Sequence, residues 1–375
     1  LDWDEGPEEG GDYGPYFQSQ RTEIYERWFE KLRESGRVYE DDGAWRFRFE
    51  RKMVAMKDLV CGEVTIDYQN ESNTPDMVIR RSDGSFVFHF VNVVDDIEMK
   101  MSHVIRGEDH LMNTPKHLQL FEALEQNPPT YAHIPLILNA DGSKMSKRDQ
   151  GAAVHEYQER GFLPSAVNNF IALLGWSPKD DDEIFSTSQL VKRFSLESVN
   201  RSPSRFDWDK CHWLNQQHLM ALSPSEFAAV SKPHVTRSGL AVTGNYEAMV
   251  ASVQEKVQTL TEVPGMIDFY LDLPPGNEEI MSKLRKNGDT SMLLRDLALT
   301  MEQITDWTQA KEAIALTAAA HGTKPGKLMF PLRVALSQRS GGPDLDEMLA
   351  ILGKEECIRR LKILNKQLAE STESQ

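Results

Sequence analysis

The chain has 375 residues and a mass of 42.7 kDa, a length that predicts two or three domains. Its 40% hydrophobic and 27% charged residues are typical of a globular protein and exclude a disordered, collagen-like or disulfide-scaffold chain. The 42 Lys and Arg against 58 Asp and Glu give a net charge of −16, which argues against a protein that coats nucleic acid through bulk charge. A local basic track could still bind RNA phosphates.

The three cysteines predict a reducing compartment. Cys61, Cys211 and Cys357 form no C-x-x-C pair, so neither a disulfide framework nor a thiolate zinc site is expected. No apolar run approaches the length of a spanning helix, and the acidic start does not resemble a signal peptide. We expect a soluble, cytoplasmic protein without a membrane partner. Because the first residue is Leu1 and not Met, we also expect the chain to be a fragment.

The pattern of apolar residues in the first third of the chain changes near residues 40–43. Before this point, Ile24, Trp28 and Leu32 lie four apart and predict an amphipathic helix, which we expect to end near Tyr39. Between residues 47 and 94, short apolar runs are separated by turn residues and predict a β-rich stretch, with one strand over 87–92.

The remainder of the chain is predicted to be mainly helical. Thr114 is expected to cap a helix that starts at Pro115, and Ile134–Leu138 reads as a short buried strand. This strand leads into a polar, cationic loop. From about Asp207 to the end the apolar spacing is almost entirely helical.

That loop carries the strongest local motif, Lys144-Met145-Ser146-Lys147-Arg148. Three cations and a hydroxyl in five residues can wrap a triphosphate and neutralise the charge that grows when its α-phosphorus is attacked. For such a pentapeptide taken alone, a solvated basic loop is the competing interpretation. The motif resembles the KMSKS signature of class I aminoacyl-tRNA synthetases, in the variant that ends in Arg.

A second motif combines an apolar segment ending in Asp95-Asp96 with a nearby arginine, Arg106. Charges at the carboxyl edge of a sheet lie where open α/β sheets bind ligands. Arg106 can hold a carboxylate through two parallel hydrogen bonds. The competing interpretation is a structural ion-pair cluster that also includes Glu108 and Asp109.

Together these motifs resemble the glutamyl-tRNA synthetase family over nearly the whole chain. The matching stretches are Leu1–Pro7, Tyr16–Arg21, Asn92–Pro115, Tyr131–Arg148, Gly161–Trp176, Phe206–Asn215 and Gly326–Ala335. The resemblance implies an α/β plus all-α fold built around a partial class I synthetase Rossmann domain.

By the same resemblance, the chain should divide into three parts. The catalytic Rossmann-like domain would span 1–110, with the remnant of a small β-rich insertion at about 41–75. A linking, or stem-contact, domain would span 111–205 and carry the KMSKR loop 144–148. An all-helical anticodon-binding region would span 206–375.

The resemblance further implies a glutamate–tRNA ligase. Such an enzyme joins glutamate to ATP as glutamyl-adenylate and transfers the acyl group to the 3′ end of tRNA(Glu), with tRNA(Gln) as a second candidate, Mg²⁺ as a cofactor and a monomeric state. The family's residue roles fall on Arg106 for the side-chain carboxylate of glutamate, Asn92 beside it, and His110 beside the adenylate. Lys147 would meet ATP, assisted by Lys144.

Of the other contacts that the resemblance implies, some are present in this sequence and some are missing. Met145 and Ser146 would complete the ATP-binding loop. Phe88 stands in the substrate site where the family has a tyrosine, so one hydroxyl contact to glutamate is missing, at a cost of about 1 kcal/mol. The family's His-x-Gly-His element is also missing, which leaves a catalytically impaired tRNA-binding protein as the alternative function.

Two further features bear on that alternative. Between Glu40 and Asp41 the family carries an insertion near the tRNA acceptor end. Here this insertion is either naturally short or omitted, and omission is the more economical explanation. No zinc ligands are predicted.

The long helical stretch after Phe206 favours a tRNA-charging enzyme over short paralogues without an anticodon region. Its aromatic and cationic side chains could contact RNA bases and phosphates, although most such residues belong to helix cores. The candidates are Trp208, Trp213, Arg333, Arg359 and Arg360.

Overall fold

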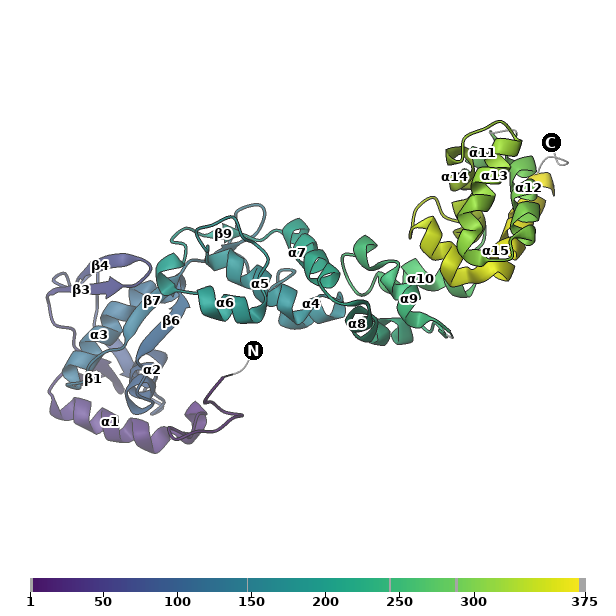
Figure 1. Cartoon of the computed structure of the whole chain (residues 1–375). Helices are drawn as coiled ribbons and strands as arrows, with labels where there is room; N and C mark the ends of the chain where they lie inside the picture. Colours follow the sequence, from purple (N-terminus) through teal and green to yellow (C-terminus); the bar gives the residue numbers. More distant parts are fainter. Residues whose placement is uncertain (1–2, 147, 243, 287–288, 371–375) are drawn as a thin grey trace. The chain divides into compact units, whose positions relative to one another are not determined.

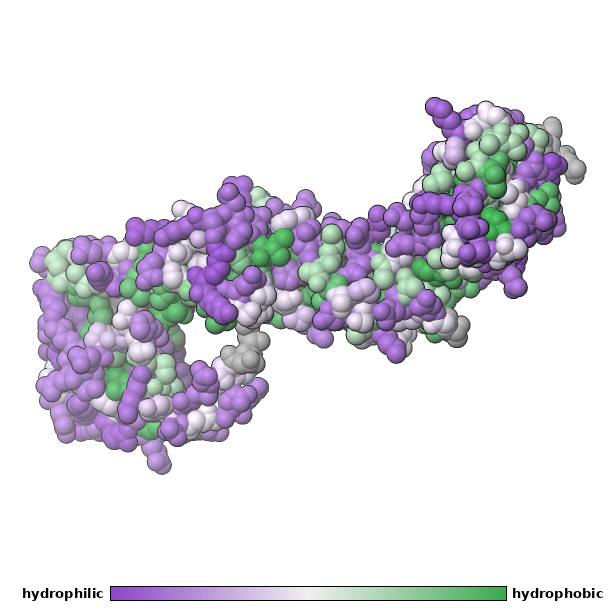
Figure 2. Space-filling view, viewed as in Figure 1, coloured by the Kyte–Doolittle hydropathy of each residue, from purple (hydrophilic) through white to green (hydrophobic). Residues whose placement is uncertain are grey.

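A computed structural model describes residues 3–146, 148–242, 244–286 and 289–370. The chain forms two compact units. The first unit comprises Leu1–Ser146 and Ile171–Phe206, and the second comprises Lys147–Phe170 and Asp207–Gln375. In the described part of the chain, no helix is long and apolar enough to cross a membrane. On the face shown in Figure 2, hydrophilic residues predominate and apolar residues form small patches between them.

The first unit contains all the named strands of the described chain. They are β1 (Val38–Asp41), β2 (Ala44–Phe47), β3 (Met53–Asp58), β4 (Gly62–Asp67), β5 (Met77–Arg80), β6 (His103–Gly107), β7 (Thr130–Ile134), β8 (Ile137–Leu138) and β9 (Ser204–Arg205). Its helices are α1 (Thr22–Glu34), α2 (Phe88–Glu98), α3 (Thr114–Ala123) and α6 (Thr187–Arg193), with the 3-10 turns η1 (Gln18–Gln20), η2 (Glu108–Asn113) and η3 (Leu196–Ser198). Helix α5 (Pro164–Gly175) contributes to both units.

The strands pair in small sheets (Figure 1). β6 and β7 are parallel and are connected through η2 and α3, as in a βαβ unit, and their register places Arg106 opposite His133. β3 and β4 form an antiparallel hairpin, and β1, β2 and β5 form a three-stranded antiparallel sheet. Burial alternates along β3, and Asp58 is the last inward-facing residue of that strand.

Helix α1 packs on this framework through a different stripe from the one predicted. Tyr25, Phe29 and Leu32 are buried, whereas Ile24 and Trp28 are only partly buried. The helix also ends at Glu34 instead of Tyr39 because the chain turns there into strand β1.

The prediction of a strand over residues 87–92 is wrong, since residues 88–98 form helix α2. Phe90, Val93 and Val94 are completely buried, and their three- and four-residue spacing places them on one helix face. β-branched and aromatic residues favour strands only weakly, so packing against the rest of the unit decides the conformation.

Residues 40–43, where the sequence pattern changes, lie at a tight hairpin. Asp41 pairs with Ala44 across a two-residue turn in which Asp42 (φ 51°) and Gly43 (φ 74°) are both left-handed, as a hairpin turn of this length requires. Glu40 lies inside β1 opposite Trp45.

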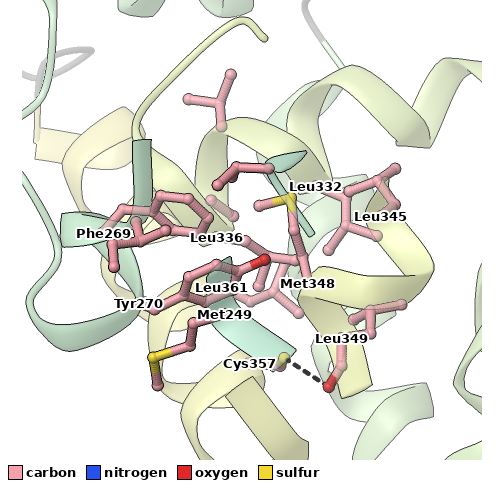
Figure 3. Packing of buried hydrophobic residues seen from close by; sticks show 14 of the residues in the cluster. Met249, Phe269, Tyr270, Leu332, Leu336, Leu345, Met348, Leu349, Cys357 and Leu361 are labelled. Atoms are coloured by element: carbon pink, nitrogen blue, oxygen red, sulfur yellow. Dashed lines mark hydrogen bonds between the residues drawn. The ribbon is translucent and has the colours of Figure 1, made fainter. Parts of the chain in front are cut away.

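Helices are the only regular secondary structure named among the described residues of the second unit. Its helices are α4 (Val154–Glu159), α7 (Trp208–Met220), α8 (Pro224–Arg237), α9 (Tyr246–Ala251), α10 (Val263–Leu271), α11 (Glu278–Arg285), α12 (Thr290–Gln303), α13 (Ala310–Ala320), α14 (Gly326–Ser337) and α15 (Leu345–Glu370), with η4 (Gln254–Lys256) and η5 (Trp307–Gln309). This confirms the helical prediction for the C-terminal half. Figure 3 shows part of its core, where Phe269, Leu336 and Leu361 lie among other buried apolar side chains.

Candidate active site

The centre of the candidate site is Arg106, which β6 directs to the same face as His133 of β7. Its Nε donates to His133 Nε2 at 3.2 Å, and its Nη2 donates to Thr114 Oγ1 at 2.8 Å. A longer contact of 3.4 Å joins Nη2 to the carbonyl oxygen of His110. The side chain is therefore held by three groups that carry no negative charge.

Behind Arg106 lies a buried pair formed by Asp58 and His133. Asp58 Oδ2 accepts a hydrogen bond from His133 Nδ1 at 2.6 Å, and both side chains are fully buried. Asp58 Oδ1 accepts the backbone N–H groups of Val60 and Cys61 at 2.9 and 2.8 Å. Burial alone would raise the pKa of Asp58, but the hydrogen bonds from Cys61 and His133 outweigh it and hold the pKa below its usual value. Asp58 therefore remains ionised.

Arg106 itself has no ion-pair partner within 4 Å among the residues that the structure describes. Burial lowers the pKa of its guanidinium, and the nearby Tyr131 and Asp96 act in the opposite direction. An arginine stays charged under these conditions. Burial raises the pKa of Asp96 to about 7, so this carboxyl neutralises only part of the charge. The site thus contains an incompletely paired cation.

Helix α2 lines the site with Phe88, Asn92 and Asp96, which are four residues apart and share one face. Asn92 Oδ1 and Asp96 Oδ2 are buried without a hydrogen-bond partner in the described structure, as is the hydroxyl of Tyr131. Asp96 and Tyr131 lie near the Arg106 cation. Buried polar atoms are normally paired, so unpaired ones near a cation indicate a place for a polar ligand.

An aromatic cluster adjoins this face. The ring of Phe88, which is 48% exposed, lies 5.7 Å from that of His110 and 6.1 Å from that of His117. His89 Nδ1 and His117 Nε2 are 3.0 Å apart. Burial lowers the pKa of His89 to about 4 and that of His117 to about 2, so both imidazoles are neutral near pH 7. The cluster adds shape to the site without adding charge.

The KMSKR loop follows the short strand β8. Met145 N donates to the carbonyl oxygen of Ile137 at 3.0 Å, which attaches the start of the loop to the strand. The exposed Lys144 extends its Nζ to within 3.4 Å of Asp109 Oδ2. Ser146 is exposed, whereas Lys147 lies outside the described residues. Lys144 is thereby connected to η2, the same turn that supplies His110.

No group of three or more His, Cys, Asp or Glu side chains that could hold a metal ion occurs in the described part of the chain.

Comparisons with known proteins agree with this arrangement of parts. The family described as "tRNA synthetases class I (E and Q), catalytic domain" matches residues 44–213, and the family "Anticodon binding domain" matches residues 226–364. The glutamate–tRNA ligase of Akkermansia muciniphila is 58% identical over 365 residues, covering 96% of this chain and 84% of its own length. The chain belongs to the glutamate–tRNA ligase family. This confirms the family and the fold class predicted from the sequence.

Other family members support the assignment. The ligase of Methylacidiphilum infernorum is 43% identical, over 96% of this chain and 83% of its own. Among solved structures, a glutamate–tRNA ligase from Elizabethkingia meningosepticum in complex with its amino acid superimposes with a TM-score of 0.89 at 27% identity, covering 97% of this chain and 86% of the other. These similarities favour the ligase over the impaired tRNA-binding protein considered as the alternative.

The family match does not give roles to the predicted anticodon residues, and of these only Arg360 is buried. Arg360 is 1% exposed, and its Nη1 donates to the carbonyl oxygens of Phe269 and Leu336 at 2.6 Å each. Arg333 donates to the carbonyl oxygen of Pro343. Trp208 packs in an aromatic cluster. Arg359 pairs with a glutamate on its own helix, and Trp213 is 37% exposed.

Three site residues were not identified from the sequence as parts of the site: Asp58, His133 and Thr114. The strand containing His133 was predicted to begin at Ile134, which excluded it. Thr114 was predicted to cap α3, but its side chain makes no cap bond and bonds Arg106 instead. The available signal was the alternation of Tyr131 and His133 with apolar neighbours before Ile134, which is typical of a strand bearing polar groups on one face.

Proposed function

We propose that this chain activates glutamate with ATP and transfers the glutamyl group to the 3′ end of tRNA(Glu). The observation that carries the proposal is the cationic Arg106 without a carboxylate partner within 4 Å in the described structure, near Asp96 and Tyr131, each of which has a buried oxygen without a hydrogen-bond partner. A charge withdrawn from water is costly unless it is paired, so such a site favours a ligand with a complementary carboxylate. The side chain of glutamate supplies that group.

The chemistry asks mainly for positioning. The α-carboxylate of glutamate is already a nucleophile, so it can attack the α-phosphorus of ATP and displace pyrophosphate without a general base. Lys144, together with Lys147, would neutralise the charge that develops on the phosphates, with Met145 and Ser146 shaping the loop around them. Mg²⁺ would arrive with ATP and be held mainly by its phosphates.

The remaining side chains would orient the reactants. Asn92 would bond the substrate next to Arg106, and His110 would lie beside the adenylate. Phe88 would bound the glutamate site through its ring alone. We further propose that the protein is a cytoplasmic monomer, that tRNA(Gln) is a second candidate substrate, and that 1–110, 111–205 and 206–375 act as catalytic, linking and anticodon-binding regions.

The test is exchange between ATP and labelled pyrophosphate, measured with glutamate, glutamine or aspartate, each with and without tRNA. We expect exchange with glutamate above both other amino acids, because only glutamate places a carboxylate at the distance of Arg106. Absence of exchange under all conditions, together with retained tRNA binding, would support the impaired tRNA-binding protein instead.

A further inference from the structure

Arg106 is held along one particular edge of its guanidinium. Its Nε donates to His133 Nε2 and its Nη2 donates to Thr114 Oγ1, and these two acceptors are themselves only 3.2 Å apart. They therefore form a fork that matches the Nε–Nη2 edge. Among the described residues, Nη1 has no hydrogen-bond partner.

The fork works only with one tautomer of His133. An arginine nitrogen can only donate, so His133 Nε2 must be the acceptor and the ring hydrogen must reside on Nδ1. That hydrogen is donated to Asp58 Oδ2 at 2.6 Å. Asp58 is in turn fixed by the backbone N–H groups of Val60, Cys61 and His133, all directed at Oδ1.

We propose that Asp58, His133 and Thr114 are positioning residues that hold the Nε–Nη2 edge of Arg106, so that its Nη1 is presented to the side-chain carboxylate of the substrate. This rests on the proposed function. Asp58 sets the tautomer, His133 and Thr114 set the orientation of the guanidinium, and none of the three touches the substrate. The fold contributes through strand register, because the parallel pairing of β6 with β7 places Arg106 opposite His133.

Asp58→Asn tests the tautomer directly. The amide oxygen of the new side chain should stay on the Oδ1 side, where three backbone N–H groups need an acceptor. Its NH₂ group would then face His133 Nδ1 and force the ring hydrogen onto Nε2, opposite the Nε–H of Arg106. Two donors facing each other should turn the guanidinium away from its fork. We expect the KM for glutamate to rise about 10- to 100-fold while the KM for ATP stays within about twofold.

Asp67→Asn is the matched control. Asp67 ends β4, is exposed, and accepts the backbone N–H of Gln69 at 2.8 Å in a turn of the same kind, but it contacts no histidine in the described structure. Its KM for glutamate should equal that of the unmodified chain. Thr114→Val and Thr114→Ser form a second pair, since valine keeps the shape of the buried side chain without the hydroxyl. The KM for glutamate should rise in Thr114→Val and recover most of that loss in Thr114→Ser.

The outcomes separate this proposal from the proposed function. If the unmodified chain shows no glutamate-dependent exchange, the function itself fails. If the unmodified chain shows this exchange, and Asp58→Asn changes the KM for glutamate no more than Asp67→Asn does, the positioning role of Asp58 is overturned while the proposed function stands. Equal rises in the KM for glutamate and for ATP would also overturn it, as expected for a merely structural aspartate. Should Asp58→Asn fail to fold, equal KM values for Thr114→Val and Thr114→Ser would contradict the proposal.

Discussion

Two arginines, one in each unit, show how the same side chain serves different ends. Arg360 in α15 donates through Nε to Glu356 at 2.5 Å and through Nη1 to two backbone carbonyls, so a carboxylate that it shares with Arg359 and two carbonyl dipoles offset its charge. Arg106 in β6 is held by a neutral imidazole, a hydroxyl and one carbonyl, with no carboxylate within 4 Å in the described structure. The first completes a fold, and the second leaves a charge for a ligand.

Burial or hydrogen bonding alone therefore does not identify a binding residue. Both arginines make several hydrogen bonds. What separates them is the balance of charge, because a protein interior stabilises a cation only when an anion or strong dipoles offset it. A cation that the fold positions but leaves without an anion is a candidate site, and its expected ligand carries the missing negative charge.

Replacing each arginine by glutamine should show most clearly that one arginine binds substrate and the other stabilises the fold. Arg106→Gln should lower kcat/KM for glutamate about 1000-fold, because a buried charged contact is worth several kcal/mol. The KM for ATP and the melting temperature should change little. Steady-state exchange kinetics at varied glutamate and ATP would measure this, and equal damage to both substrates would mean that Arg106 is structural.

Arg360→Gln should show the reverse pattern. Removing the cation leaves the buried carbonyl oxygens of Phe269 and Leu336 without the Arg360 donor, while Glu356 keeps its pair with Arg359. The free energy of unfolding should therefore fall by about 3–5 kcal/mol. Urea unfolding would measure the loss. At a temperature where the variant is folded, its KM for glutamate should match that of the unmodified chain; a raised KM would contradict a purely structural role.

The loop lysines should affect ATP chemistry and not glutamate affinity. Lys147→Ala should lower the adenylation rate about 100-fold, since it removes one cation from the developing phosphate charge. Binding of tRNA should be nearly unchanged. Rapid-quench measurement of adenylate formation would test this, and turnover equal to that of the unmodified chain would exclude the loop from the mechanism.

A smaller effect should follow pH through Asp96. Burial raises its pKa to about 7, so the carboxyl is neutral below this value and becomes an anion above it. The anion would compete with the substrate carboxylate for Arg106, and the KM for glutamate should therefore rise about three- to tenfold between pH 6 and 8. Asp96→Asn should remove most of this rise. A pH profile identical in the variant would mean that Asp96 does not titrate beside the substrate.

The smallest effect concerns Phe88. Phe88→Tyr supplies the hydroxyl that the resemblance implies at this position, and one additional hydrogen bond to glutamate is worth about 1 kcal/mol, or about a fivefold lower KM. Because the ring is 48% exposed, the hydroxyl needs no new cavity. An unchanged KM would show that the hydroxyl does not reach the substrate.

Local spacing was sufficient to predict the helical C-terminal half, while the roles of Arg106 and of the 144–148 loop stay predictions. It failed for α2, where Phe90, Val93 and Val94 favour strands by composition but are buried as one face of a helix. The decisive term there was packing against residues distant in the chain, which a local window does not contain.

The partners of Arg106 could not be predicted from local sequence spacing for a related reason. Asp58 lies 75 residues from His133, and His133 lies 27 residues from Arg106. Only the pairing of β6 with β7 and the packing of β3 beside them bring the three together. The roles of Lys147, Asn92 and His110 stay predictions of the resemblance.

A crystal structure of the chain with glutamate bound would show whether Arg106 holds the substrate as proposed. We expect the side-chain carboxylate of glutamate at hydrogen-bonding distance, about 2.7–3.2 Å, from Nη1 of Arg106, with Nε still bonded to His133. Glutamate bound with that carboxylate away from Arg106, or with Nε of Arg106 released from His133 to meet it, would contradict this role of Arg106.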